Sequence, residues 1–149
     1  MPANVLTTAI RLLSRREHTA YELQQKLQQR QFSSNDITDA LQRLLETDLQ
    51  SDLRFCAAYI RQQQERFGDF RLRYELAKRG AEEGTIENAI TAAALPAETT
   101  RVIEVMQKKY PQGLAHSEQN SARRFLQSRG FSADSIRCAI RQAICRSAP

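Results

Sequence analysis

An apolar pattern that occurs three times along the chain limits the possible folds more than any other feature. Each copy has seven matching positions in the same order, and the second and third copies begin 49 and 50 positions after the one before. Such a period is typical of structural units that bury their apolar sides partly against their neighbours. We therefore predict an array of repeats. The matching positions are Leu23, Leu27, Arg30, Phe32, Ile37, Ala40 and Leu41; Leu72, Leu76, Arg79, Ala81, Ile86, Ala89 and Ile90; and Ala122, Leu126, Arg129, Phe131, Ile136, Ala139 and Ile140.

The spacing of the apolar residues predicts helices throughout, because it follows a period of 3.6 and strand-like alternation is missing. Thr19 with Glu22 forms a capping box that opens one helix, and Pro96 suits the first turn of another. The sequence predicts an all-α, elongated array of about nine helices in three three-helix repeats, spanning residues 1–48, 49–95 and 96–149 as one continuous domain. Further helix caps are expected at Ser33 or Ser34, Ser51, Ser117 and Ser132.

A basic residue recurs at the end of one helix in every copy, at Arg30, Arg79 and Arg129. A cation in the last turn favours the negative end of the helix dipole, so we interpret these arginines as structural. Gly80 and Gly130 follow two of them, where a left-handed residue is expected, and Gln31 takes that place in the first copy.

No catalytic arrangement is found in the sequence. His18 and His116 are far apart and are placed in loops, and no Gly-rich phosphate loop or nucleophile turn occurs. The three cysteines are odd in number and lack a C-x-x-C pair, so we expect buried, inert thiols rather than a disulfide framework or zinc site. The chain also lacks a long apolar run, and its first residues, MPANVLTTAI, lack the charged start and cleavage site expected of a signal peptide. We expect a cytoplasmic protein that is not an enzyme and holds no cofactor or metal.

Positive charge is concentrated in the last third of the chain. Residues 96–149 hold nine basic and four acidic residues, whereas the earlier residues are balanced, so the net charge of +5 lies there. Such a region attracts polyanions. A solvated, arginine-rich helical surface is the alternative interpretation.

Several basic residues are predicted to lie on surfaces that could bind a partner. On a helical wheel, Arg54 and Arg61 fall opposite the apolar stripe of the fourth helix and are expected to face solvent. Arg71 and Lys78 share a face of the next helix that is not basic in the other two copies. Lys108, Lys109, Arg123 and Arg124 form a second, looser cluster, without aromatic interleaving strong enough to indicate base stacking. The candidate binding residues are Arg54, Arg61, Arg71, Arg73, Lys78, Lys108, Lys109, Arg123 and Arg124.

Four segments, in order, resemble the signatures of the RecX family of bacterial recombinase modulators. They read REHTAYELQQKL at 16–27, SDLRFCAAYIRQ at 51–62, LRYELAKRGAEEGTIENAI at 72–90 and RRFLQSRGFSADSI at 123–136. The central element is Asp52-x-Arg54-Phe55 followed by Tyr59 and Arg61. Family members usually have Gly-Pro before the fifth helix, whereas here Gly68 is followed by Asp69.

The resemblance implies a curved, all-helical monomer that docks in the groove of a RecA filament on DNA. Such a protein would impede ATP hydrolysis, strand exchange and coprotease action, with consequences for DNA repair, homologous recombination and the SOS response. It could also contact single- or double-stranded DNA directly. The alternative is a helix-turn-helix-like DNA-binding protein that acts without RecA, although no helix starts with the Arg, Asn and Gln cluster expected for reading bases.

These expectations predict a helical circular dichroism spectrum without strand signal and a radius of gyration larger than that of a compact globule of 149 residues. A spectrum with substantial strand, or solution scattering of a compact sphere, would contradict the predicted repeat array.

Overall fold

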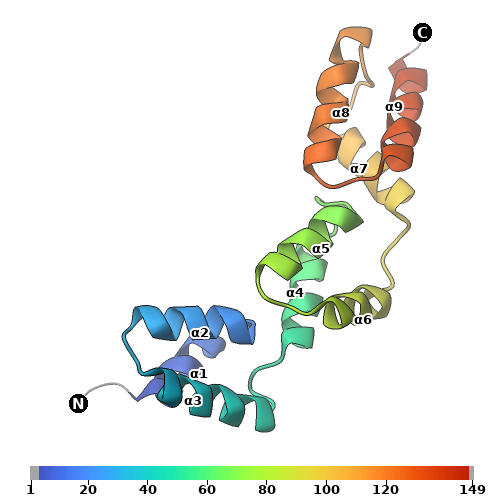
Figure 1. The fold of residues 1–149 in the computed structure, drawn as a ribbon. Helices are drawn as coiled ribbons and strands as arrows, with labels where there is room; N and C mark the ends of the chain where they lie inside the picture. The colour runs from blue at the N-terminus through green and yellow to red at the C-terminus, as the bar shows by residue number, and fades with distance from the viewer. Residues whose placement is uncertain (1–3, 148–149) are drawn as a thin grey trace. The chain divides into compact units, whose positions relative to one another are not determined.

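A computed structural model describes residues 4–147, which form nine α-helices and one short 3₁₀-helix, with no strand among them (Figure 1). The all-α prediction is therefore confirmed. The helices are α1 (Val5–Arg15), α2 (Ala20–Gln29), α3 (Ser34–Glu46), α4 (Asp52–Gln63), α5 (Asp69–Lys78), α6 (Glu83–Ala93), α7 (Glu98–Lys109), η1 (His116–Glu118), α8 (Gln119–Ser128) and α9 (Ala133–Ser147).

Contacts group the described residues into two compact units. Unit 1 contains the residues up to Tyr59 together with Leu76–Ala92, and unit 2 contains Ile60–Glu75 together with the residues from Ala93 onward. The boundary passes through α4 and α5. The predicted division into three repeats follows the sequence copies, whereas the contacts assign parts of the middle copy to different units.

The repeated apolar positions form the cores of both units. In unit 1, Leu23, Leu27 and Ile37 pack with residues of α1 and α3. In unit 2, Leu126 and Phe131 pack with residues of α7 and α9. The shared skeleton thus marks the buried face of each helix, as the sequence predicted.

Three details differ from the sequence-based expectations. Leu45, which continues the apolar stripe of α3, is 57% exposed, because Leu44 already occupies the buried side of that turn. Only Cys56 is buried among the cysteines; Cys138 and Cys145 are exposed on α9. Pro96 precedes α7 instead of lying in its first turn, because the helix begins at Glu98.

The predicted helix starts are confirmed at four places. The hydroxyl oxygens of Thr19, Ser33, Ser51 and Ser132 each accept a hydrogen bond from a backbone N–H three residues later, at 3.0–3.2 Å. These side chains satisfy N–H groups that have no partner within the helix. Ser117 instead lies inside η1, because α8 begins only at Gln119.

The predicted left-handed residues are also confirmed. Gly80 and Gly130 have φ values of 92° and 83°, and Gln31 adopts 67° at the matching place in the first copy. A residue with this backbone ends each helix and turns the chain toward the next one.

A hydrogen bond at equivalent repeat positions occurs in both units. In unit 1, the Thr19 hydroxyl donates to the carbonyl oxygen of Arg79 (2.6 Å). In unit 2, the backbone N–H of Gly68, 49 positions after Thr19, donates to the carbonyl oxygen of Arg129 (2.8 Å). Each bond joins the start of one repeat's second helix to the end of the next repeat's second helix. The recurring arginine therefore supplies a backbone acceptor as well as a side chain.

Further hydrogen bonds reinforce this junction in unit 1. The Gln50 amide donates to the carbonyl oxygen of His18 (3.2 Å), and Asp52 accepts the backbone N–H of Ala20 at 3.0 Å. The side chains come from the entry to α4 and act on the start of α2.

In unit 2, one arginine makes the matching contacts. Arg101, which is 3% exposed, donates to the carbonyl oxygens of Gln64 (3.1 Å) and Phe67 (2.5 Å) and to the Asp69 carboxylate (2.7 Å). Phe67 and Asp69 lie 49 positions after His18 and Ala20, and Arg101 lies 49 after Asp52. The two junctions thus use equivalent positions, but an acidic residue, Asp52, makes the contacts in unit 1 where a basic residue, Arg101, makes them in unit 2.

Gly68→Ala should lower the free energy of unfolding by about 1–3 kcal/mol, the usual cost of forcing an extra methyl into a packed site. A Cβ at Gly68 would lie against the Gly130 carbonyl and 2.7 Å from the Cα of Phe131, both of which belong to the backbone. Urea denaturation of the full chain measures the change.

Gly84→Ala is the matched control, since a Cβ there meets nothing within 4 Å. It should stabilise the protein by up to about 0.5–1 kcal/mol, because alanine loses less backbone entropy in a helix. Equal effects of the two substitutions would contradict the close approach at Gly68.

Candidate functional site

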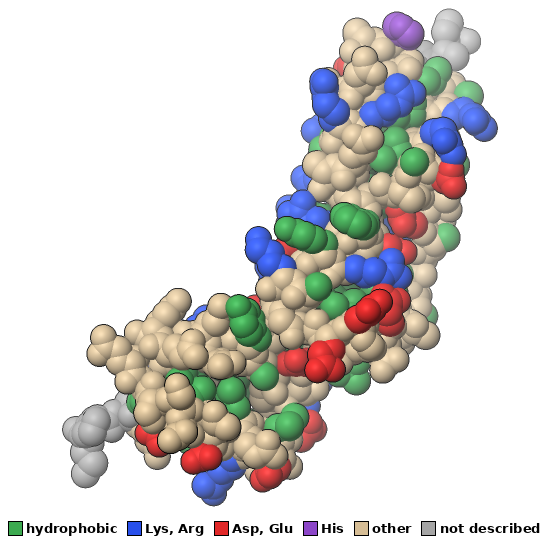
Figure 2. All heavy atoms as spheres, viewed as in Figure 1, with side chains coloured by type: hydrophobic (Ala, Val, Ile, Leu, Met, Phe, Trp, Pro, Cys, Tyr) green, Lys and Arg blue, Asp and Glu red, His purple; other side chains and the backbone are tan. Residues whose placement is uncertain are grey.

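The structure separates the predicted binding residues into those held by the fold and those that extend from it. Lys and Arg side chains gather on the visible face over α8 and α9 of unit 2 (Figure 2). The individual contacts decide which cations remain accessible to a partner.

Arg54 lies at the surface, with 40% of its side chain exposed, but contacts that the helical wheel did not predict hold it within unit 1. Its guanidinium pairs with the Glu17 carboxylate at 3.1 Å and the Asp48 carboxylate at 3.0 Å, and it donates to the Asp48 carbonyl oxygen at 2.8 Å. The hydrogen bond to Glu17 is the main cause that raises the pKa of Arg54. The helical wheel missed this role because both partners lie outside α4.

Arg71 is likewise held by the fold, in unit 2. It pairs with Glu75 at 2.9 Å, donates to the carbonyl oxygen of Ser128 at 2.9 Å, and lies over the Phe67 ring, 4.9 Å from its centroid. Its side chain is still 38% exposed, so Arg71 lies at the surface but is held in place by these partners. Its guanidinium connects the start of α5 to the end of α8.

The other predicted cations are exposed at the surface. Within residues 4–147, Arg61, Lys78, Arg123 and Arg124 have no ion-pair partner, and Lys108 makes one long contact, at 4.0 Å, to Glu65. Arg73 is exposed as well. Exposed side chains without an ion-pair partner keep their charge available for binding.

A cluster of cations and aromatic rings forms in unit 2, which we call the Phe67–Phe125 cluster. Lys109 lies over the Phe125 ring, 3.9 Å from its centroid, and Arg129 lies 5.0 Å from it. Arg66, Arg71 and Arg129 lie 4.9–5.9 Å from the centroid of Phe67. Cations at such distances are attracted by the negative faces of the rings.

This cluster places an aromatic ring beside Lys109, a member of the second predicted basic group, as a support for its cation. Phe67 is next to Arg66 in sequence, and Phe125 is four residues before Arg129, so each pair is a local signal. What the sequence could not give is the approach of the two pairs, which depends on the packing of the loop after α4 against α8. The buried Arg101 was also missed.

Electrostatic crowding is evident at Arg129. Its pKa is lowered first by burial and then by the charges of Arg66 and Arg71. The cluster also borders a surface pocket of about 290 Å³, lined by Glu65, Arg66, Val105, Lys108, Lys109, Phe125 and Arg129. The pocket walls therefore carry more positive than negative charge.

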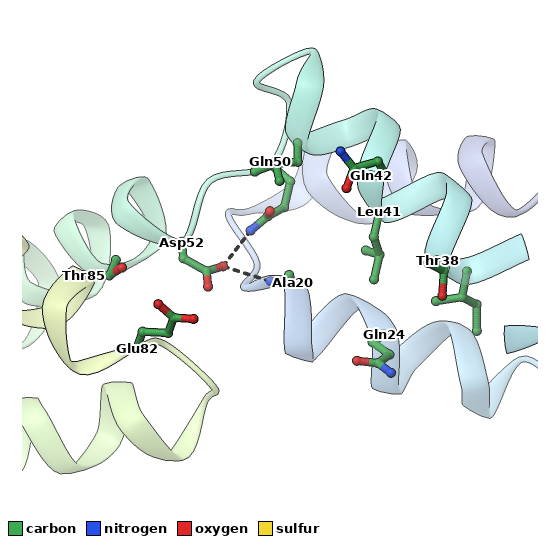
Figure 3. Close-up of a pocket in the computed structure, with 11 residues that line it drawn as sticks. Ala20, Gln24, Thr38, Leu41, Gln42, Gln50, Asp52, Glu82 and Thr85 are labelled. Atoms are coloured by element: carbon green, nitrogen blue, oxygen red, sulfur yellow. Dashed lines mark hydrogen bonds between the residues drawn. The ribbon is translucent and has the colours of Figure 1, made fainter. Parts of the chain in front are cut away.

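A groove of opposite character lies in unit 1 between α2, α3 and the start of α6 (Figure 3). It has a volume of about 560 Å³ and no basic residue in its lining. The Asp52 carboxylate faces Ala20 and Gln50, to which it is hydrogen-bonded, and Glu82 lies beside it. The groove thus offers carboxylate, amide and aliphatic groups.

His18 is buried, at 1% exposure, within the unit 1 junction. Its Nδ1 lies 3.0 Å from the carbonyl oxygen of Arg16, and its Nε2 lies 2.9 Å from Nζ of Lys26. A neutral ring that donates from Nδ1 and accepts at Nε2 fits both partners. Burial is the main cause that lowers the pKa of His18, and the charges of Arg16 and Lys26 lower it further.

Over residues 4–147, no group of three or more His, Cys, Asp and Glu side chains is arranged to hold a metal ion. No helix in this range is long and apolar enough to cross a membrane.

Three-helix groups joined by equivalent contacts define a helical-repeat protein. The sequence models of the first and second three-helix domains of RecX match residues 6–44 and 51–90. The regulatory protein RecX of Neisseria meningitidis serogroup C is 34% identical over 136 residues, 91% of this chain and 88% of that protein. The Vibrio vulnificus RecX is 38% identical over 137 residues, 89% of this chain and 88% of its own length.

Solved structures show the same fold. The crystal structure of RecX from Lactobacillus salivarius has a TM-score of 0.74 at 22% identity, covering 93% of this chain and 94% of that chain. A second RecX crystal structure has a TM-score of 0.76 at 18% identity, covering 89% and 69%. The chain belongs to the RecX family of regulatory proteins, and the resemblance found in the sequence is confirmed.

The free energy of unfolding should fall when the pH is lowered from 7.5 to 5.5. The unfolded chain protonates His18 near its ordinary pKa of about 6.5, whereas the folded chain protonates it only at lower pH, so protons favour unfolding. The loss is at most about 1.4 kcal/mol for each pH unit below about 6.5. Urea denaturation at a series of pH values measures it.

His18→Asn keeps a donor near Nδ1 and should flatten this pH dependence. His116→Asn is the control, because His116 is exposed and should leave it unchanged. The same pH dependence in His18→Asn and the parent would show that His18 is not its source.

Proposed function

We propose that this protein inhibits RecA by binding in the groove of the RecA–DNA filament, where it impedes ATP hydrolysis, strand exchange and coprotease activity. Membership of the RecX family, with relatives aligned over about nine-tenths of the chain, is the observation that carries the proposal. Membership of a family of regulatory proteins named RecX is consistent with a role in regulating RecA. We propose that it acts by binding, without catalysing a reaction.

The exposed cations supply the contacts in this proposal. Arg61, Arg73 and Lys78 extend from α4 and α5, and Lys108, Lys109, Arg123 and Arg124 extend from α7 and α8. A nucleoprotein filament presents DNA phosphates and acidic protein side chains, both of which attract such charges. Each exposed contact is weak, but several made at once provide avidity.

Arg54 and Arg71 have a different role in this proposal. Their guanidinium groups are bound to carboxylates and backbone carbonyls of their own units. Replacing either with Glu would place like charges beside Glu17 and Asp48, or beside Glu75, and would therefore disturb the fold. They act as positioning residues, and substitutions there do not test binding.

The direct experiment is RecA ATP hydrolysis on single-stranded DNA, titrated with this protein and with RecA from the same organism. The filament is formed first, in the presence of excess DNA. Inhibition by less protein than is needed to bind the free DNA then cannot come from sequestering that DNA. Inhibition that follows the binding of free DNA would favour the helix-turn-helix-like alternative.

Reversing exposed charges should weaken inhibition and leave the fold intact. Arg123→Glu with Arg124→Glu should raise the protein concentration for half-inhibition by about tenfold at low salt, since each exposed pair contributes up to about 1 kcal/mol. The thermal midpoint should hardly change, because exposed substitutions usually alter stability by about 0.5 kcal/mol or less.

Arg11→Glu with Arg43→Glu is the control, with the same change in charge at exposed positions outside the proposed surface. The difference between variant and parent should shrink as salt rises, because screening weakens the contacts that the parent makes. Equal loss of inhibition in both double variants would indicate a response to net charge alone.

A further inference from the structure

We propose that the pocket beside the Phe67–Phe125 cluster binds a phosphate group of a nucleic-acid strand, through Arg66, Lys109 and Arg129. The inference deepens the proposed function and rests on it for its biological setting, because the DNA of the filament would supply the strand. The binding chemistry itself is a property of this pocket.

The pocket is assembled from segments that are distant in sequence. Arg66 lies in the turn after α4, Lys109 ends α7, and Arg129 follows the last residue of α8. All belong to unit 2 and line the same cavity of about 290 Å³. This cavity is large enough for a phosphate and part of its sugar.

The positive charge of the pocket is only partly neutralised by the protein. Glu75 is already paired with Arg71, and the remaining acid, Glu65, is exposed and lies 4.0 Å from Lys108. Burial lowers the pKa of Arg129, and the nearby charges of Arg66 and Arg71 lower it further because like charges repel. An anion between them relieves that repulsion, so binding has a source of free energy beyond its direct contacts.

Aromatic rings hold these cations in place before a ligand arrives. Lys109 and Arg129 lie over the Phe125 ring, and Arg66 and Arg129 lie near the face of Phe67. Side chains that are already positioned lose less rotamer freedom on binding. The rings therefore support the cations and are not available to stack on bases. The pocket is expected to bind the phosphate backbone of a strand rather than its bases.

A phosphate fits this arrangement better than a carboxylate side chain. Arginine forks bind carboxylates and phosphates alike, but a nucleic-acid strand presents successive phosphates to the several separate charges around this hollow. Exposed Arg123 and Arg124 on α8 extend the basic surface of the same unit, which suits a polyanion.

The test uses the full chain and a fluorescein-labelled oligothymidylate, followed by anisotropy over a range of salt concentrations. Arg66→Gln with Lys109→Gln should raise the Kd about tenfold at low salt. It should also reduce the slope of log K against log salt by about 1.4, or about 0.7 for each lost phosphate contact on a single strand.

Arg137→Gln with Arg141→Gln is the matched control, because it removes the same charge from exposed positions on α9. It should leave both quantities close to those of the parent. If the pocket variant fails to fold, Lys109→Gln alone at the exposed end of α7 should show about half of the change in slope.

The pocket proposal is overturned if the pocket variant binds the oligonucleotide like the parent, or no more weakly than the control. Binding of polyglutamate is measured in the same way. The proposal is also overturned if the pocket variant loses affinity for polyglutamate but not for the oligonucleotide, since the pocket would then accept carboxylates. RecA ATPase is measured separately on the same proteins. A parent that fails to inhibit RecA refutes the proposed function, whereas loss of oligonucleotide binding in the pocket variant still supports the pocket.

Discussion

A hydrogen bond to the last carbonyl of a helix is the constraint on which the described units depend. The final carbonyls of a helix have no partner within it, and leaving one buried and unpaired is costly. Thr19 satisfies that of Arg79 in unit 1, and the backbone of Gly68 satisfies that of Arg129 in unit 2. The backbone approach at Gly68 leaves no room for a side chain. This contact sets the start of one helix against the end of another.

The groups around these two bonds differ in charge although their positions match. In unit 1 the amide of Gln50 and the carboxylate of Asp52 bind the turn before α2. In unit 2 a single buried guanidinium, that of Arg101, binds the turn before α5. Its ion pair with Asp69 lies directly after Gly68, at the start of α5. A buried arginine is tolerated here because backbone carbonyls and a carboxylate satisfy its donors.

Charge in this protein therefore serves two purposes that composition cannot separate. Arg54, Arg71 and Arg101 stabilise the packing through carboxylates and carbonyls, whereas Arg61, Lys78, Arg123 and Arg124 extend toward solvent. Lys109 and Arg129 of the Phe67–Phe125 cluster have both roles. They lie over an aromatic ring of the fold, and they also line a surface pocket. A binding protein gains from this arrangement because its charges are positioned before the partner arrives.

The sequence by itself determined the helices, most of their caps and most of the buried positions. These features depend on contacts within a few residues and on a period that three copies repeat, as at Thr19, Gly80 and Leu126. Its motifs, in their order along the chain, also indicated the RecX family. Tertiary structure decided which cations are accessible and where a pocket forms. Arg54 meets Glu17, and Arg129 comes to lie over Phe67, only after segments 37 and 62 residues apart have packed. A helical wheel gives the direction of a side chain from its own helix, but its partners come from other helices.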